Sequence, residues 1–153
     1  MSFFSAASES ALRLLTYVHA HADARQKLGV SEIAAATGTP AAYAAKILQI
    51  LARKGLLSST RGPHGGFYLD PQQAQQLSAF EVVVAMDGAS IFTTCMLGLK
   101  ECSSKQPCPM HDDFVQIRQR LELALRQTSI SSLSERYNSG RYFVTLDDIH
   151  PKK

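Results

Sequence analysis

The chain has 153 residues, of which 45% are hydrophobic, and a formal net charge of +3. This length supports one substantial core, because two separate cores of half the size would each be marginally stable. The apolar run at residues 11–18 is interrupted by Arg13 and is followed by no small-residue cleavage site, so we predict neither a signal peptide nor a membrane span and expect a cytoplasmic protein.

The positive charge is concentrated in the N-terminal half of the chain. Residues 1–71 hold seven Lys or Arg against four Asp or Glu, and no acidic residue lies between Glu32 and Asp70. The basic residues of that interval are Lys46, Arg53, Lys54 and Arg61. A basic surface of this kind suits contact with the phosphates of nucleic acid.

Three helices are predicted before residue 55. Apolar residues recur every three or four positions over residues 8–21. A short helix is predicted to start at Ser31 as its N-cap and to end at Gly38. Thr39 is predicted to cap a third helix, with Pro40 as its first residue. The tight turn between the second and third helices predicts a helix-turn-helix, with residues 40–54 as the recognition helix.

A β-hairpin and a fourth helix are predicted next. Residues 56–60 and 67–69 have the composition of two short strands, and the glycines between them permit a tight connection. Ser78 and Glu81 form a capping-box pattern that predicts a helix over residues 79–86. The expected fold class is therefore mostly α: a winged helix-turn-helix with a small β-hairpin wing over residues 1–88.

A loop and a long helix are predicted to follow. Residues 89–111 have no sustained periodicity, and loops of this length are usually functional or disordered. Residues 112–153 are predicted to be a dimerisation helix with a C-terminal tail, in which residues 141–146 fit a short strand. The apolar seam of that helix consists of Phe114, Ile117, Leu121 and Leu125. The seam packs on its own domain or on a second copy, and we favour a homodimer.

The three cysteines lie in the loop, at positions 95, 102 and 108. An odd number of clustered thiols argues against the disulfide framework of a secreted domain. Cysteine thiolates hold iron-sulfur clusters, and the wide spacing lets the backbone pass around one. Structural zinc sites more often begin with a closer cysteine pair, although His111 would complete a Cys3His set. We favour a cluster over zinc and over uncommitted thiols.

Three segments together resemble one protein family. They are Ser8-Glu9-x-Ala11-Leu12-Arg13, the run from Ile47-Leu48-Gln49 through Arg61-Gly62-Pro63-x-Gly65-Gly66-Phe67, and the three cysteines. These segments are similar to those of the bacterial winged-helix transcriptional regulators of the IscR and NsrR type, the Rrf2 family. The resemblance implies a homodimer that binds a palindromic operator in double-stranded DNA, and not an enzyme.

The resemblance also implies which residues contact DNA. The recognition helix enters the major groove and the wing arginine, Arg61, reaches the minor groove. From their positions on this helix and wing, the expected DNA-binding residues are Thr39, Ala41, Tyr43, Lys46, Arg61, Gly62 and His64. Ala45 and Lys46 occupy positions where regulators of the IscR type have a base-reading Glu and Gln, so we expect an operator different from theirs, with Lys46 as a phosphate or guanine contact.

The cysteines of the family hold an iron-sulfur cluster. The resemblance implies that Cys95, Cys102 and Cys108 are ligands, with a fourth from His111 or from Glu9 of the partner subunit's first helix. We favour a 2Fe-2S cluster with His111 over a 4Fe-4S cluster with Glu9. The cluster would order the loop and switch operator affinity in response to redox state, nitric oxide or iron-sulfur status, with repression as the expected direction.

Two other functions remain open from the sequence. One is a metal-free regulator on the same fold, in which two of the cysteines form a reversible disulfide. The other is a zinc-stabilised winged-helix module that binds proteins. An enzyme is not expected, because no set of nucleophile, base and acid and no phosphate-binding loop has a plausible arrangement.

Overall fold

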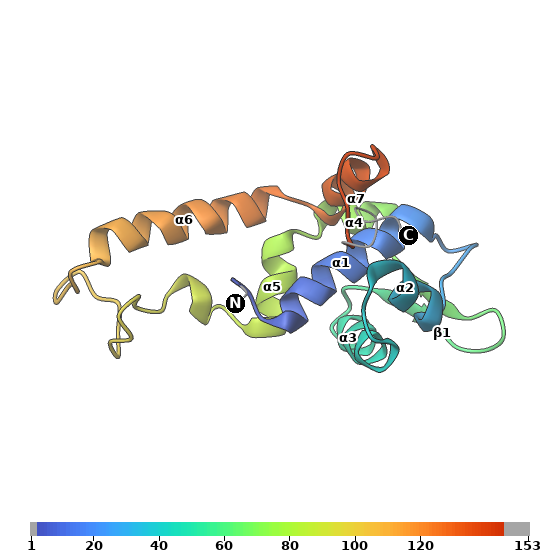
Figure 1. Ribbon diagram of the computed structural model, residues 1–153, viewed down its shortest axis with the longest axis horizontal. Coiled ribbons are helices and arrows are strands. Elements are labelled where there is room, and N and C mark those ends of the chain that lie inside the picture. The colour runs from blue at the N-terminus through green and yellow to red at the C-terminus, as the bar shows by residue number, and fades with distance from the viewer. Residues whose placement is uncertain (1–2, 146–153) are drawn as a thin grey trace, which may run out of the picture.

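The computed structural model describes residues 3–145. Its N-terminal half consists of α1 (Ala6–His21), α2 (Val30–Thr37), α3 (Ala41–Arg53), β1 (Ser58–Thr60) and β2 (Gly66–Tyr68) (Figure 1). The two strands pair antiparallel, with Ser59 opposite Phe67. The predicted winged helix-turn-helix is confirmed. Within the described residues, no helix is long and apolar enough to cross a membrane.

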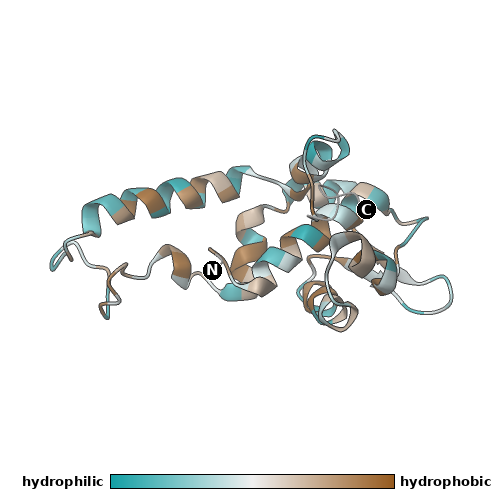
Figure 2. Cartoon of the chain, viewed as in Figure 1, coloured by the Kyte–Doolittle hydropathy of each residue, from teal (hydrophilic) through white to brown (hydrophobic). Residues whose placement is uncertain are grey.

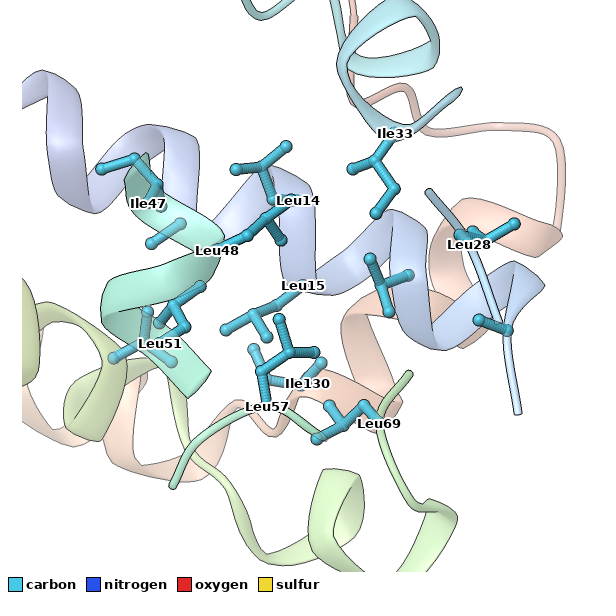
Figure 3. Packing of buried hydrophobic residues seen from close by; sticks show 14 of the residues in the cluster. Leu14, Leu15, Leu28, Ile33, Ile47, Leu48, Leu51, Leu57, Leu69 and Ile130 are labelled. Atoms are coloured by element: carbon cyan, nitrogen blue, oxygen red, sulfur yellow. The ribbon is translucent and has the colours of Figure 1, made fainter. Parts of the chain in front are cut away.

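One hydrophobic core joins these elements (Figure 3). Its largest fully buried members include Leu14, Leu15, Ile33, Ile47, Leu48, Leu51, Leu69 and Ile130. Burying each such side chain stabilises the fold by about 1.5–3 kcal/mol. The exposed face of α3 is therefore held in place by the leucines and isoleucines on its opposite face.

The ends of the helices differ in part from the prediction. Gly38 adopts φ 62° and ends α2 as expected, but α2 begins after Gly29, so the predicted cap at Ser31 is wrong. The chain is fixed just before α2 by Leu28, whose amide donates to the Phe67 carbonyl at 3.0 Å. The helix can therefore start two residues earlier than the capping pattern suggested. Pro40 is the N-cap of α3 rather than its first residue.

Two helices lie outside the prediction. They are α4 (Pro71–Gln76) and α7 (Ile130–Asn138). α7 brings the chain back to the N-terminal core, where Ile130 is fully buried and the Ser134 hydroxyl donates to the Thr16 carbonyl at 3.0 Å. The short strand expected after α7 is absent from residues 141–145, and residue 146 lies outside the described residues.

The long helix α6 (His111–Gln127) runs away from the core and carries the cysteine loop at its far end (Figure 1). At its near end, the Arg126 guanidinium lies 3.5 Å over the Phe80 ring of α5 (Ala79–Asp87). The Phe80 ring also packs against Phe92 of the 3-10 helix η1 (Ser90–Phe92), with ring centroids 4.9 Å apart. The loop is therefore linked to the N-terminal half through α5, η1 and α6.

The capping box of α5 gives a test that depends on pH. The Glu81 amide donates to Ser78 Oγ at 3.2 Å, and the Ser78 amide donates to Glu81 Oε2 at 2.8 Å. The bonds from the amide and hydroxyl of Ser78 lower the pKa of Glu81 below its usual 4.5. The ionised carboxylate thus stabilises the fold above that pH, and the contribution is lost as the pH falls through the lowered pKa.

We expect Ser78→Ala to lower the free energy of unfolding by about 1 kcal/mol near neutral pH. The loss should become smaller as the pH falls through the lowered pKa of Glu81, because the protonated carboxyl accepts the bond from the Ser78 hydroxyl less well. Urea denaturation over a series of pH values below neutral measures it, with Ser104→Ala as a control at an exposed position. A loss that stays the same until the protein unfolds in acid would contradict this role of the capping box.

Candidate DNA-binding face and cysteine loop

The helix-turn-helix presents one exposed face of α3. Ala41 and Lys46 are exposed on this face. Tyr43 is half-buried and packs against the core, and Thr39 is buried in the turn, with its hydroxyl 3.0 Å from the Thr37 hydroxyl. Ala41 and Lys46 are thus free to meet a ligand, whereas Thr39 and Tyr43 fix the position of the helix.

The wing loop between β1 and β2 carries Arg61, Gly62 and His64, all exposed. Gly62 has φ 99°, which favours glycine, and its carbonyl accepts from the Gly65 amide at 2.9 Å. A Cβ at Gly65 would lie 2.3 Å from the Thr60 carbonyl oxygen, so a side chain there would collide with the strand end. The two glycines let the loop fold tightly and leave Arg61 open to solvent.

Cys95 and Cys108 form the first pair of candidate ligands. Both side chains are buried, and they share a hydrogen bond. The pKa of the Cys95 thiol is lowered chiefly by the Leu99 amide, with smaller contributions from the Leu97 and Gly98 amides and from Cys108, while burial opposes the shift. This backbone arrangement favours a thiolate at Cys95.

Cys102 and His111 form the second pair. The Cys102 sulfur lies 3.4 Å from His111 Nδ1, at the first residue of α6. Arg118 approaches the same sulfur from the next turns of α6 and donates to it through Nη2 at 3.0 Å. Its Nη1 donates to the Thr94 carbonyl at 2.6 Å. One guanidinium therefore joins the start and the middle of the loop to α6.

The two pairs do not converge on one point. Among residues 3–145, no group of three or more His, Cys, Asp or Glu side chains is close enough to hold a metal ion. Glu9 lies in the first turn of α1 and belongs to neither pair. The donor types nevertheless fit an iron-sulfur cluster, since three thiols and an imidazole are ligands that such clusters take.

The positive charge of Arg118 also suits a site that holds an anionic group. Arg118 is only 8% exposed, and its Nε is buried without a hydrogen-bond partner among the described residues. No carboxylate within that part of the chain forms an ion pair with it. A buried cation is costly unless negative charge lies beside it, and thiolates or a thiolate-bound cluster would provide that charge.

Arg118 is a residue of the site that was not predicted from the sequence. The available signal was its position on α6, directly after Ile117 and three residues before Leu121, inside an otherwise apolar seam. An arginine at such a position either reaches solvent along its stem or has a buried partner. Only the folded loop shows that the partners are the Thr94 carbonyl and the Cys102 sulfur.

A protein-family model matches most of the chain. The model for Rrf2, described as an iron-dependent transcriptional regulator, matches residues 4–136. A protein of Aquifex aeolicus named among HTH-type transcriptional regulators is 26% identical over 132 residues, which span 85% of this chain and 90% of that protein. The regulator IscR of Photorhabdus laumondii is 28% identical over 104 residues, 68% of this chain and 62% of IscR. The expectation that the chain is not an enzyme is confirmed by these regulators.

Solved structures share the fold. CymR of B. subtilis, titled the global cysteine regulator, aligns with TM-score 0.70 and 18% identity over 89% of this chain and 98% of CymR. The IscR of T. potens aligns with TM-score 0.69 and 13% identity over 92% of each chain. At these identities the likeness concerns the fold alone.

The pairing of the thiols predicts how the metal-free protein oxidises. We expect diamide to link Cys95 to Cys108, because these side chains already share a hydrogen bond and the lowered pKa of Cys95 favours the reactive thiolate. Peptide mapping without reductant identifies the disulfide. Cys102→Ser should retain it and Cys108→Ser should abolish it, whereas a disulfide that includes Cys102 in the unmodified sequence would show that the pairing is wrong.

Proposed function

The chain belongs to the Rrf2 family of transcriptional regulators, and we propose that it is a homodimeric DNA-binding regulator whose operator affinity is controlled by an iron-sulfur cluster. The observation that carries the proposal is that one loop and the helix after it carry three thiols, an imidazole and a buried guanidinium that has no carboxylate partner in the described chain. That loop is attached to a helix packed on the winged-helix unit. We expect the regulator to act as a repressor.

DNA is held by α3 and the wing in this proposal. α3 enters the major groove with Ala41 and Lys46 foremost, and the exposed Arg61 enters the minor groove, whose potential attracts a guanidinium. Gly62 and His64 contact the sugar-phosphate backbone beside it. Thr39 and Tyr43 act mainly by fixing the approach of the helix, since the structure buries Thr39 and half-buries Tyr43.

A second copy of the chain packs against α6 in this proposal. Ile117 is 53% exposed although it lies in the apolar seam, and Phe114, Leu121 and Leu125 are only half-buried. Figure 2 shows apolar bands along α6 between hydrophilic ones. A twofold dimer would cover this seam and present two recognition helices to a palindromic operator.

Cys95, Cys102 and Cys108 would hold the cluster. His111 is the favoured fourth ligand, with a 2Fe-2S cluster, because its Nδ1 already lies beside the Cys102 sulfur. Glu9 of the partner subunit's α1, with a 4Fe-4S cluster, is the alternative. When bound, the cluster would supply redox and nitric oxide reactivity that the side chains lack.

The loop controls DNA binding through the elements that join it to α3. α6 is fixed at one end to Phe80 of α5, while its first residue, His111, belongs to the cysteine loop. A loop held in one shape fixes how two α6 helices meet, and so sets the spacing of the recognition helices. The switch can be no larger than the difference in operator affinity between the two loop states.

A metal-free thiol switch is the second candidate. The hydrogen bond between the Cys95 and Cys108 side chains and the lowered pKa of Cys95 favour it. In that case the loop would change shape through a disulfide, and His111 would have no role in the response.

The proposal is tested by comparing operator affinity with and without the cluster. An operator is first selected from random duplex DNA, and fluorescence anisotropy then measures affinity at matched salt for the anaerobic loaded protein and for Cys102→Ser. We expect at least a fivefold difference, about 1 kcal/mol of coupling. Equal affinities would refute control by the cluster while leaving DNA binding intact.

Two substitutions on the proposed DNA-binding face should weaken DNA binding in different ways. Arg61→Ala should weaken specific binding by about 1–3 kcal/mol, because it removes a contact that depends on groove shape. If Lys46 binds a phosphate, Lys46→Ala should reduce the slope of log affinity against log salt concentration by about 1. Lys105→Ala, an exposed change in the loop, is the matched control. If all three variants bind as the unmodified protein does, the assigned face is wrong.

The dimer predicts a position-specific effect on α6. Ile117 and Leu123 are almost equally exposed, at 53% and 54%, but they are six residues apart and face different directions. Ile117→Glu should sediment as a monomer, because it buries a charge in the seam. Leu123→Glu should remain dimeric. Analytical ultracentrifugation decides, and a dimeric Ile117→Glu would place the interface elsewhere.

A further inference from the structure

The Arg118 guanidinium makes contacts on three sides. Nη1 donates to the Thr94 carbonyl at 2.6 Å, and Nη2 donates to the Cys102 sulfur at 3.0 Å. Its guanidinium carbon lies 5.4 Å from the centroid of the Phe114 ring, one turn earlier on α6. Thr94 directly precedes Cys95, so these bonds close the loop segment that contains the first two cysteines.

Resting on the proposed function, we infer that Arg118 is the positioning residue of the cluster site, which shapes the loop before the cluster is bound and compensates its negative charge afterwards. It is not a ligand, since a guanidinium has only donors to offer. It acts on two parts of the loop. It orients the sulfur of Cys102, and it holds the carbonyl of Thr94, the residue directly before Cys95.

The geometry requires an arginine. Two nitrogens of the planar guanidinium reach two acceptors on separate parts of the loop. The single ammonium group of a lysine, on a flexible side chain, would do this less well. The buried Nε has no partner among the described residues, so a third donor remains for a sulfur atom. The planar group therefore suits a site rich in sulfur acceptors.

The charge has a defined effect on redox behaviour. Hydrogen bonds to the sulfurs set the reduction potential of iron-sulfur clusters. A fixed positive charge favours the reduced state, because that state carries one more negative charge. Loss of Arg118 should therefore shift the reduction potential to a more negative value and weaken retention of the cluster.

The test compares Arg118→Gln, Arg118→Lys and Arg120→Gln, the last being a matched loss of an exposed arginine on the same helix. Three quantities are measured: amide hydrogen exchange of the metal-free loop at residues 95–102, the rate of iron loss to a chelator from the anaerobic loaded protein, and its reduction potential. Circular dichroism checks that every variant is folded.

We expect the loop of Arg118→Gln to exchange its amide hydrogens faster and its cluster to have a more negative reduction potential. The variant should also lose iron faster, because loss of a residue that hydrogen-bonds to a metal ligand typically lowers metal affinity roughly 10–100-fold. Arg118→Lys should restore the potential, because it keeps the charge, but not the protection of the loop. Arg120→Gln should match the unmodified protein.

The inference is overturned if Arg118→Gln matches Arg120→Gln in loop exchange and in the two cluster measurements. If the unmodified protein binds no cluster, the proposed function fails instead. In that case the exchange measurement on the metal-free loop still decides whether Arg118 positions it.

Discussion

Arg118 is the one charged side chain that is buried among residues 3–145, and it bonds to two separate parts of the cysteine loop. The loop lies at the far end of α6, away from the main hydrophobic core (Figure 1). Cys95 and Cys108 are buried in it, and polar contacts join its separate parts. Arg118 provides two of them, to the Thr94 carbonyl and the Cys102 sulfur, and its uncompensated charge favours anionic sulfur in the same place.

The two regions to which we assign function lie at opposite ends of the molecule, with the wing at one end and the loop at the other (Figure 1). The elements between them are well packed. Arg126 and Phe80 join α6 to α5, and α7 ties the chain after α6 back onto α1 through Ile130 and Ser134. A change in the loop would therefore reach the recognition helix through packed helices rather than through a direct contact, and a dimer would convert it into a change of spacing.

The sequence predicted the features that local chemistry decides. The glycines of the wing, the capping box at Ser78 and the stop at Gly38 each rest on a backbone requirement that few residues meet, and all three occur in the structure. The start of α2 was misplaced because a long-range bond from Leu28 overrides the cap at Ser31. α7 was missed because Ile130 is buried by residues far away in the sequence. The same holds for Arg118, whose partners come from across the loop.

The thiol placement expected from the sequence is only partly reflected in the structure. In the structure Cys95 lies beside Cys108, and Cys102 lies beside His111. A cluster would require all three thiols to lie together. In the proposed function, cluster binding would bring the pairs together by movement of the loop around His111 and Arg118, which both lie on α6.

Whether the cysteine loop binds an iron-sulfur cluster is decided by the content of iron, acid-labile sulfide and zinc per chain in protein purified without oxygen. We expect iron and sulfide in equal amounts with visible absorption, and little zinc. Zinc alone, or no metal in anaerobic protein, would show that the loop holds no such cluster and would favour the structural-zinc or thiol-switch function on the same winged-helix fold.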